Sequence, residues 1–295
     1  MAKHQLQRVK QGTFRRSIIT AHCLIAACGL LAGAAHAQGS VQGVLQTGSQ
    51  TITPKFATAL LHDNAEGLLQ GKGRQLRILL SDVDVGPAGL QGIAFVPATV
   101  MAREGQVRGL ILTLAPDNPN EVLATVLERP EGGFSLANIT LTSKPDPVIT
   151  NYKMDGKTVS GSIKLSNADA KSSGISFSAP VQAVPAVTAD LKGKAALESE
   201  QVKSMRARVQ AMVKGDSEAA AKLATPAENR QVEAAVAQMG PEAKNMMRSA
   251  GREMLPTLNR VERVVVRGDH AVVIFKAGEA WQEMALIDGQ WKTGK

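Results

Sequence analysis

The chain has 295 residues, of which 34 are Lys or Arg, 26 are Asp or Glu and only 3% are aromatic, and its formal net charge is +8. Five of the cations lie before residue 38, where no acidic residue occurs, so the rest of the chain carries about +3 (8 minus 5). Proteins that bind nucleic acid usually combine strong positive charge with aromatic stacking side chains. This composition therefore argues against nucleic acid as a partner.

Residues 1–37 are typical of a secretory signal peptide. A basic head ending at Arg16 is followed by a short apolar stretch and by Ala35-His36-Ala37, whose small residues suit signal-peptide cleavage. Thr20 and His22 interrupt the apolar stretch, so it is too short for a stable membrane span. We expect cleavage after Ala37 and a periplasmic or secreted mature protein without a transmembrane segment.

Two features leave other export routes open. Arg15-Arg16 followed by Ser17-Ile18-Ile19 resembles a twin-arginine signal. Ile25-Ala26-Ala27-Cys28 resembles a lipoprotein cleavage box, which is an alternative to cleavage after Ala37. Because Cys23 and Cys28 are the only cysteines and both lie in the leader, we expect no disulfide and no thiolate metal site in the mature chain.

Residues 38–182 are predicted to form an all-β domain, an antiparallel sandwich or barrel. Short runs of strand-forming residues recur along this region, separated by turn signals such as Asp155-Gly156. Val107–Leu114 alternates between two faces, as a strand does. Ile78-Leu79-Leu80 is apolar on both faces, which predicts a central strand.

This first region offers little chemistry. Gly67–Gly73 looks like a phosphate loop but has the wrong spacing, and Gly73 stands where a magnesium-binding hydroxyl belongs. Asp82 and Asp84 could share a calcium ion, yet no further acidic residues cluster near them. His62-Asp63 could be a base with its orienting acid, although an exposed loop pair is the more ordinary interpretation.

Residues 183–190 are predicted to link two domains. They belong to the stretch Ala179–Ala189, where Pro180 and Pro185 hold the backbone extended and remove two hydrogen-bond donors. Before this stretch the residues alternate as in strands, and after it they follow a helical spacing.

Residues 191–295 are predicted to form a smaller α+β domain, with helices packed on an antiparallel sheet. The expected helices are Glu198–Lys214, Ser217–Ala224, a helix to Met239 that Thr225-Pro226-Ala227-Glu228 begins with a capping box, and one after Gly240-Pro241. The expected strands are Val261–Arg267, Ala271–Lys276, Trp281–Ile287 and Gln290–Thr293.

The order of these elements resembles the NTF2-like (cystatin-like) α+β superfamily. The resemblance lies in the opening helix, in the restart Gly215-Asp216-Ser217-Glu218-Ala219-Ala220, and in the closing run Met284–Lys292 with its Asp288-Gly289 turn. It implies a curved sheet wrapped around helices with a conical cavity. The Asp-His dyad of the catalytic members has no clear counterpart, since His270 lies beside Asp269 in a predicted turn.

Two groups of side chains are candidates for a ligand or partner face. Lys244, Arg248 and Arg252 are four residues apart, so they line one side of a helix and could meet an acidic partner or anionic headgroups. A solvated face balanced by Glu253 or by acids on other elements is the more ordinary interpretation. Phe275, Trp281 and Trp291 fall on three neighbouring strands, where they could line the cavity or form its packed core. The methionines of the helices, Met246 among them, are predicted to fill the core.

No complete catalytic or cofactor-binding constellation is recognisable, so we expect no catalytic residue, no cofactor and no metal. The sequence favours an exported, non-enzymatic binding or interaction protein of the cell envelope, whose partner is an envelope protein or a small ligand. An NTF2-like enzyme with His270 as its base, and a purely structural envelope component, remain alternatives.

Overall fold

The computed structural model describes residues 39–47, 50–69, 73–93, 96–128, 137–142, 149–167, 170–276 and 280–294. The expected export signal at 1–37 therefore lies outside the described residues. Within the rest, Ala37–Lys295 groups into one compact unit. None of the described helices is both long and apolar enough to cross a membrane.

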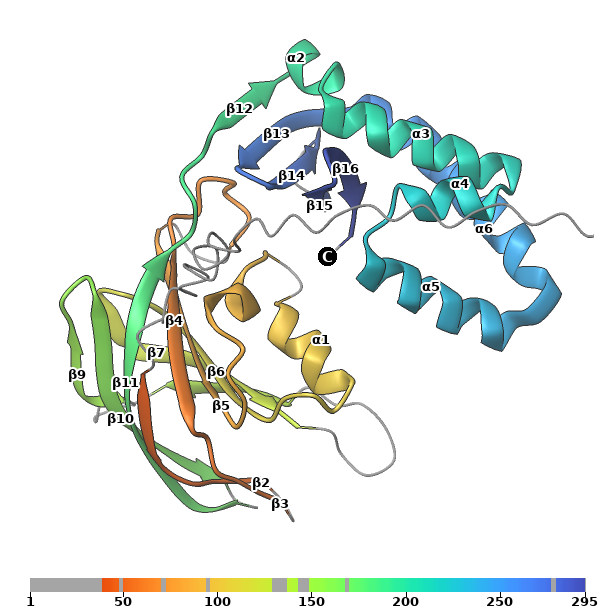
Figure 1. Cartoon of the computed structure of the whole chain (residues 1–295). Coiled ribbons are helices and arrows are strands. Elements are labelled where there is room, and N and C mark those ends of the chain that lie inside the picture. The colour runs from red at the N-terminus through yellow and green to blue at the C-terminus, as the bar shows by residue number, and fades with distance from the viewer. Residues whose placement is uncertain are drawn as a thin grey trace, which may run out of the picture. The chain divides into compact units, whose positions relative to one another are not determined.

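The first region is dominated by one curled sheet, a half-barrel whose strand order is β8-β7-β6-β5-β4-β11-β10-β9, with β1 paired to β11 (Figure 1). All its pairs are antiparallel except β11 with β4. The predicted antiparallel β-rich region is thus confirmed as a single curled sheet. Its strands are β1 (Ser40–Gly43), β4 (Phe56–His62), β5 (Gln75–Ser81), β6 (Gly109–Ala115), β7 (Asn118–Leu127), β8 (Ala137–Thr142), β9 (Ile149–Met154), β10 (Thr158–Asn167) and β11 (Ala170–Ala183).

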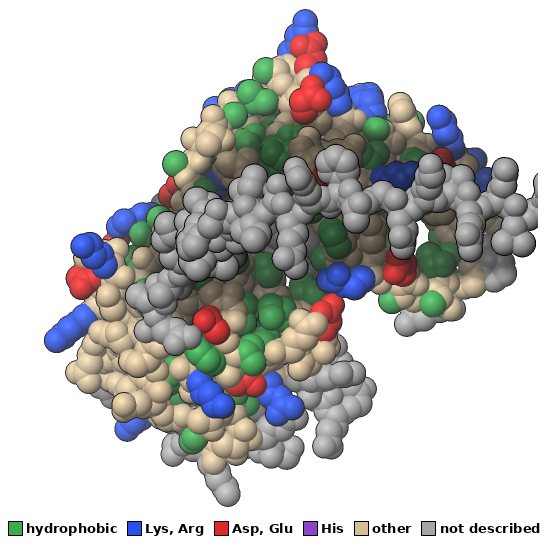
Figure 2. Space-filling model, viewed as in Figure 1, with side chains coloured by type: hydrophobic (Ala, Val, Ile, Leu, Met, Phe, Trp, Pro, Cys, Tyr) green, Lys and Arg blue, Asp and Glu red, His purple; other side chains and the backbone are tan. Residues whose placement is uncertain are grey.

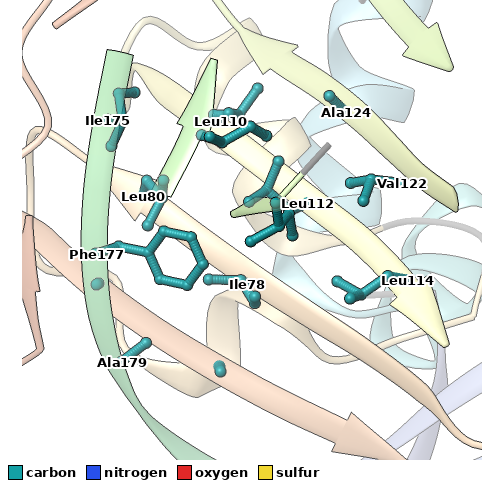
Figure 3. Packing of buried hydrophobic residues seen from close by; sticks show 14 of the residues in the cluster. Ile78, Leu80, Leu110, Leu112, Leu114, Val122, Ala124, Ile175, Phe177 and Ala179 are labelled. Atoms are coloured by element: carbon teal, nitrogen blue, oxygen red, sulfur yellow. The ribbon is translucent and has the colours of Figure 1, made fainter. Parts of the chain in front are cut away.

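Both faces of this sheet are covered, as the apolar run in β5 predicts. Ile78 and Leu80 join the larger core, which also takes side chains from β6, β7 and β11 (Figure 3). Leu79 points the other way, into a cluster with Leu90 and Ala98. Those two residues belong to η1 (Pro87–Leu90) and α1 (Pro97–Arg103), two short helices that the sequence reading missed. A separate hairpin, β2 (Leu45–Thr47) and β3 (Gln50–Ile52), adds Leu45 and Ile52 to the larger core.

The proline-containing stretch begins inside β11 and ends at β12 (Ala189–Lys192), so only residues 184–188 lie outside strands. This connection is held at both ends: the Val184 amide donates to the Leu61 carbonyl (3.0 Å), and the Thr188 amide donates to the Val266 carbonyl (2.8 Å). It is therefore not a free tether. The division into two domains with a linker at 183–190 stays a prediction.

The second region has a five-stranded antiparallel sheet in the order β12-β13-β14-β15-β16 and helices that pack on it (Figure 1). The predicted strands are confirmed within a residue, and the prediction did not include β12. The elements are α2 (Lys194–Leu197), α3 (Glu200–Lys214), α4 (Ser217–Lys222), α5 (Pro226–Met239), η2 (Gly240–Glu242), α6 (Ala243–Thr257), η3 (Leu258–Arg260), β13 (Val261–Arg267), β14 (His270–Phe275), β15 (Trp281–Ile287) and β16 (Gln290–Thr293).

Thr225 caps α5 as predicted, because its hydroxyl accepts from the Glu228 amide (3.3 Å). The reciprocal half of the capping box is absent from the described contacts. The Thr225 amide instead donates to the Thr293 carbonyl (2.8 Å), and the Glu228 carboxylate pairs with Arg208 (2.8 Å). The Thr225 amide is therefore paired with the strand residue Thr293 and not with the Glu228 side chain.

One face of the second sheet packs against α3 and α6. Met205 and Val209 of α3 meet Val264 and Val273 of the sheet in a second core, together with Met254 and Met284. Met246 differs from the prediction, since 53% of it is exposed near the start of α6. Its place in the helical period is correct, but no element covers that side of the helix among the described residues.

Candidate functional site

The three aromatic candidates do not gather around one cavity. Phe275 and Trp291 pack against the core between the second sheet and its helices. Trp281 packs on the opposite face, against the small cluster of Val265, Val272 and Ile274. The register explains the split: Trp281 pairs with Ile274, whose side chain points away from that of its neighbour Phe275.

The three basic candidates on α6 also separate. Lys244 and Arg252 are exposed, whereas the half-buried Arg248 reaches the end of α3, where its Nη2 donates to the Lys214 carbonyl (3.5 Å). Gly215 closes α3 in the left-handed conformation (φ 75°) and leaves the space that the Arg248 guanidinium fills. Arg248 therefore packs against the end of α3, whereas Arg252 does not make this contact.

Arg252 lines an open groove between α3 and α6, with a volume of about 460 Å³. One side of each helix forms its walls, since residues at this spacing share a helix face. Arg206 stands on the α3 wall and donates from Nη2 to the Asn259 side chain (3.4 Å). None of the described side chains that line the groove is acidic; they are Arg206, Gln210, Val213, Arg252, Leu255, Pro256 and Asn259.

A second constellation, a buried ionic cluster, lies on the other face of the second sheet. The Arg267 guanidinium of β13 binds Glu66 through Nε (2.6 Å), binds both oxygens of Asp63, and donates from Nη1 to the Pro185 carbonyl (2.6 Å). Arg267 is only 6% exposed and Glu66 only 4%. These ion pairs and hydrogen bonds offset the free-energy cost of removing the charged groups from water.

The alternation of β13 places this cluster. Arg263, Val265 and Arg267 share one face, while Val264 and Val266 point to the helices. Arg263 forms a bidentate ion pair with Asp190 of β12 (2.7 and 3.1 Å) and donates to the Ala65 carbonyl (2.9 Å). Two arginines thus clamp the segment 63–66, which follows β4, onto this face of the second sheet.

His62 ends β4 and is also buried, with 4% of its surface exposed, so the expectation of an exposed His62-Asp63 pair was wrong for the histidine. Its Nδ1 accepts a hydrogen bond from the Asn64 amide (3.0 Å). A neutral imidazole carries one proton, so this bond places the proton on Nε2. The Oε2 atom of Glu66 lies 3.9 Å from that nitrogen.

Both histidines outside the predicted leader line one small pocket of about 50 Å³. His270 comes from β14, and Glu283 of β15 lies beside it. Glu283 accepts from the Ile93 amide (3.0 Å), while Arg77 of β5 donates to the carbonyls of Leu90 (3.0 Å) and Gly92. Leu68 and Ile93 complete the contact by packing on Val265, Val272 and Ile274.

Burial is the main perturbation of the titrating groups here. It lowers the pKa of His62, and the nearby Arg77 and Arg267 lower it further, against the opposing pull of Glu66 and Asp63. Hydrogen bonds from Arg267 hold the pKa of the Asp63 carboxyl below its usual range, although burial works against them. His62 is therefore neutral and Asp63 ionised near pH 7.

His62, Asp63 and Glu66 lie close enough to be tested as a metal site, since one ligand atom of each falls within 4.8 Å of the others. Their chemistry does not fit a cation. Both carboxylates already bind the Arg267 guanidinium, and coordination through Nε2 would displace the proton that the Asn64 contact places there. The cluster is better explained as an ionic clamp.

Sequence reasoning missed this clamp, although β13 carries a signal for it. The sequence Val-Glu-Arg-Val-Val-Val-Arg places Arg263 and Arg267 four residues apart, with Val265 midway between them, on the same side of a mostly apolar strand. A strand with cations on one buried face requires acidic partners from elsewhere. The sequence does not show that those partners follow β4, about 200 residues earlier.

Comparisons of this chain with family models, with known proteins and with solved structures found no match. The NTF2-like resemblance accordingly remains a hypothesis based on the order of elements.

Proposed function

We propose that this protein is an exported, non-enzymatic binding protein of the cell envelope that holds an acidic segment of a partner protein in the groove between α3 and α6. The observation that carries the proposal is the groove itself, with Arg206 on one wall, Arg252 on the other and apolar side chains between them. Guanidinium groups bind carboxylates through bidentate hydrogen bonds, which favours an acidic peptide as ligand.

The surroundings of the groove agree with a local anion site. Neither Arg206 nor Arg252 has an ion pair with a described carboxylate, whereas Lys203 of α3 already binds Glu200 (2.7 Å). Val213 and Leu255 give the groove an apolar floor, so acidic side chains interleaved with apolar ones would match it. Elsewhere, on the face drawn in Figure 2, acidic and basic side chains lie interspersed, which favours a local site over a field of one sign.

A second candidate function is an enzyme that uses His270, because this imidazole lines the small pocket and its Nε2 lies 3.5 Å from Asp269. The pocket volume of about 50 Å³ is enough for a few water molecules at most, and Asp269 is largely exposed. His62 carries its proton on Nε2, and its Nδ1 already accepts from the Asn64 amide, so neither nitrogen is available as a base. These features favour binding at the groove over catalysis at the pocket.

A titration with a labelled peptide of alternating Glu and Leu tests the proposal, with a Lys-Leu peptide as the charge control. We expect saturable binding of the acidic peptide alone and a weakening with added salt, because the contact is an exposed charge pair. Arg206→Gln and Arg252→Gln should each weaken binding about tenfold, or about 1.4 kcal/mol.

Lys222→Gln is the matched control, since it removes the same charge from α4, whose residues do not line the groove. Equal losses in Lys222→Gln and Arg252→Gln would show a general charge effect and contradict the groove proposal, as would the absence of binding. Preference for anionic vesicles over the peptide would replace the protein partner with a lipid surface.

A further inference from the structure

We propose that residues 62–69 form a proton-operated latch, in which protonation of His62 releases this segment from the second sheet. The latch lies in the buried ionic cluster and is independent of the groove between α3 and α6.

The segment is fastened at three points. Arg263 and Arg267 hold its middle, as described above, and Leu68 packs on the second sheet. Asn64 fastens its two ends to each other, because its Oδ1 accepts from the Leu69 amide (3.0 Å) and its own amide donates to His62. Asn64 has the left-handed φ of 56°, so the turn depends on these hydrogen bonds for its conformation.

Protonation of His62 breaks one of these fastenings directly. The imidazolium carries protons on both nitrogens, so its Nδ1 can no longer accept from the Asn64 amide. Two N–H groups would then face each other at the bend of the turn. Because His62 is 4% exposed, the ring cannot turn toward solvent without moving the segment.

The charges around His62 do not repair the loss. On its own segment it faces Asp63 and Glu66, and from other strands it faces Arg77 of β5, Arg267 of β13, His270 of β14 and Glu283 of β15. Asp63 and Glu66 already bind Arg267, and Glu283 binds the Ile93 amide. An imidazolium must therefore compete with a guanidinium for the same carboxylates.

Opening the segment resolves that competition, since an exposed imidazolium regains water on both nitrogens. The lowered pKa of His62 agrees with this opening, because it means that the closed segment binds a proton less tightly than the open segment does. As pH falls from the ordinary histidine pKa toward the lowered pKa of the closed segment, each unit of pH should then raise the open fraction up to tenfold, and the rise should level off below the closed-segment pKa. The latch is closed at neutral pH and released by acid.

Hydrogen exchange of the Asn64 and Leu69 amides, corrected for intrinsic rates, tests the latch on the protein from residue 38 onward without a histidine tag. Between pH 7 and pH 5 we expect their protection to fall several-fold, while the β5 and β6 amides keep theirs. His62→Asn retains an acceptor near Nδ1 but does not titrate, so its protection at these amides should stay constant over this range.

His270→Asn is the matched control, since it removes the other imidazole of the same pocket and should keep the wild-type pH response. Proton NMR of the two imidazoles provides a second measurement, with the His62 signal titrating below pH 6.5. Unchanged protection in the wild type, an equal fall in His62→Asn, or a His62 signal that titrates above pH 6.5 would each overturn the proposal.

Discussion

Arg267 of β13 donates to Glu66, which lies 201 residues earlier in the chain, over a distance of 2.6 Å, and both side chains are almost fully buried. This pair joins the segment after the first sheet's β4 to the second sheet. It also explains why a strand as apolar as β13 carries an arginine on a covered face. Its partner was brought there by the tertiary fold.

Removal of this guanidinium should be strongly destabilising. Arg267→Gln leaves Glu66 buried without its cation, and loss of one partner of a buried pair typically costs about 3–5 kcal/mol. Urea unfolding measures this loss as a lower midpoint with an unchanged slope. The exposed pair Lys222–Glu218 supplies the control, because Lys222→Gln should leave the unfolding midpoint nearly unchanged. Similar losses in both variants would show that the cluster contributes no more than a surface pair.

Glu66 and Arg267 should be energetically coupled. Glu66→Gln combined with Arg267→Gln should be less destabilising than the two single losses added, since no buried charge is left without its partner. A double-mutant cycle in urea gives the coupling free energy. Additive losses would mean that Glu66 and Arg267 act independently despite their contact.

Global stability should fall with acid in two steps. The folded pKa of His62 is below its ordinary 6.5, so the unfolded chain binds the proton first and stability declines as pH falls below about 6.5. The folded pKa of Asp63 is below 3.8, so its contribution is complete above that pH and is lost as pH falls through the folded value. Unfolding free energy measured from pH 8 to pH 3 should show the first step and the onset of the second, and His62→Asn should remove only the first. A curve that is flat between pH 7 and pH 5 would contradict the assignment.

Gly251 of α6 should resist substitution because the two helices of the groove touch there. A Cβ atom at this position would lie 2.9 Å from the Val213 amide nitrogen and 3.0 Å from the Met212 Cβ. We expect Gly251→Ala to lose about 1–2 kcal/mol, since overpacking of about 1–3 kcal/mol exceeds the helix-propensity gain of alanine. Thermal unfolding checks this, with the exposed Ser249→Ala of the same helix as the control. A more stable Gly251→Ala variant would show that the helices can separate without cost.

The Thr225 cap of α5 should stabilise the protein by about as much as helix N-caps usually do. Thr225 is 3% exposed and its hydroxyl accepts from the Glu228 amide, so Thr225→Ala should cost about 1 kcal/mol or somewhat more. Thr225→Ser keeps the acceptor and should recover most of that loss. Chemical denaturation of the two variants makes the comparison. Equal destabilisation of both would attribute the effect to the lost methyl group.

The sequence by itself determined the elements whose causes are local. Thr225-Pro226 begins α5 and Gly215 ends α3, because caps and left-handed glycines act within one helical turn. The apolar run Ile78-Leu79-Leu80 likewise placed β5 inside its sheet, since a strand that is apolar on both faces must be covered on both.

Only the tertiary structure decided which distant residues meet. Nothing near His62 in the sequence indicates that it would be buried, because its cover comes from β13 and from the segment that follows it. Lys244, Arg248 and Arg252 share a helical spacing, yet the packing of α6 on α3 turned one of them into a helix contact and placed another in a groove. Periodicity specifies the face of an element, whereas the partner of that face depends on contacts between segments far apart in the chain.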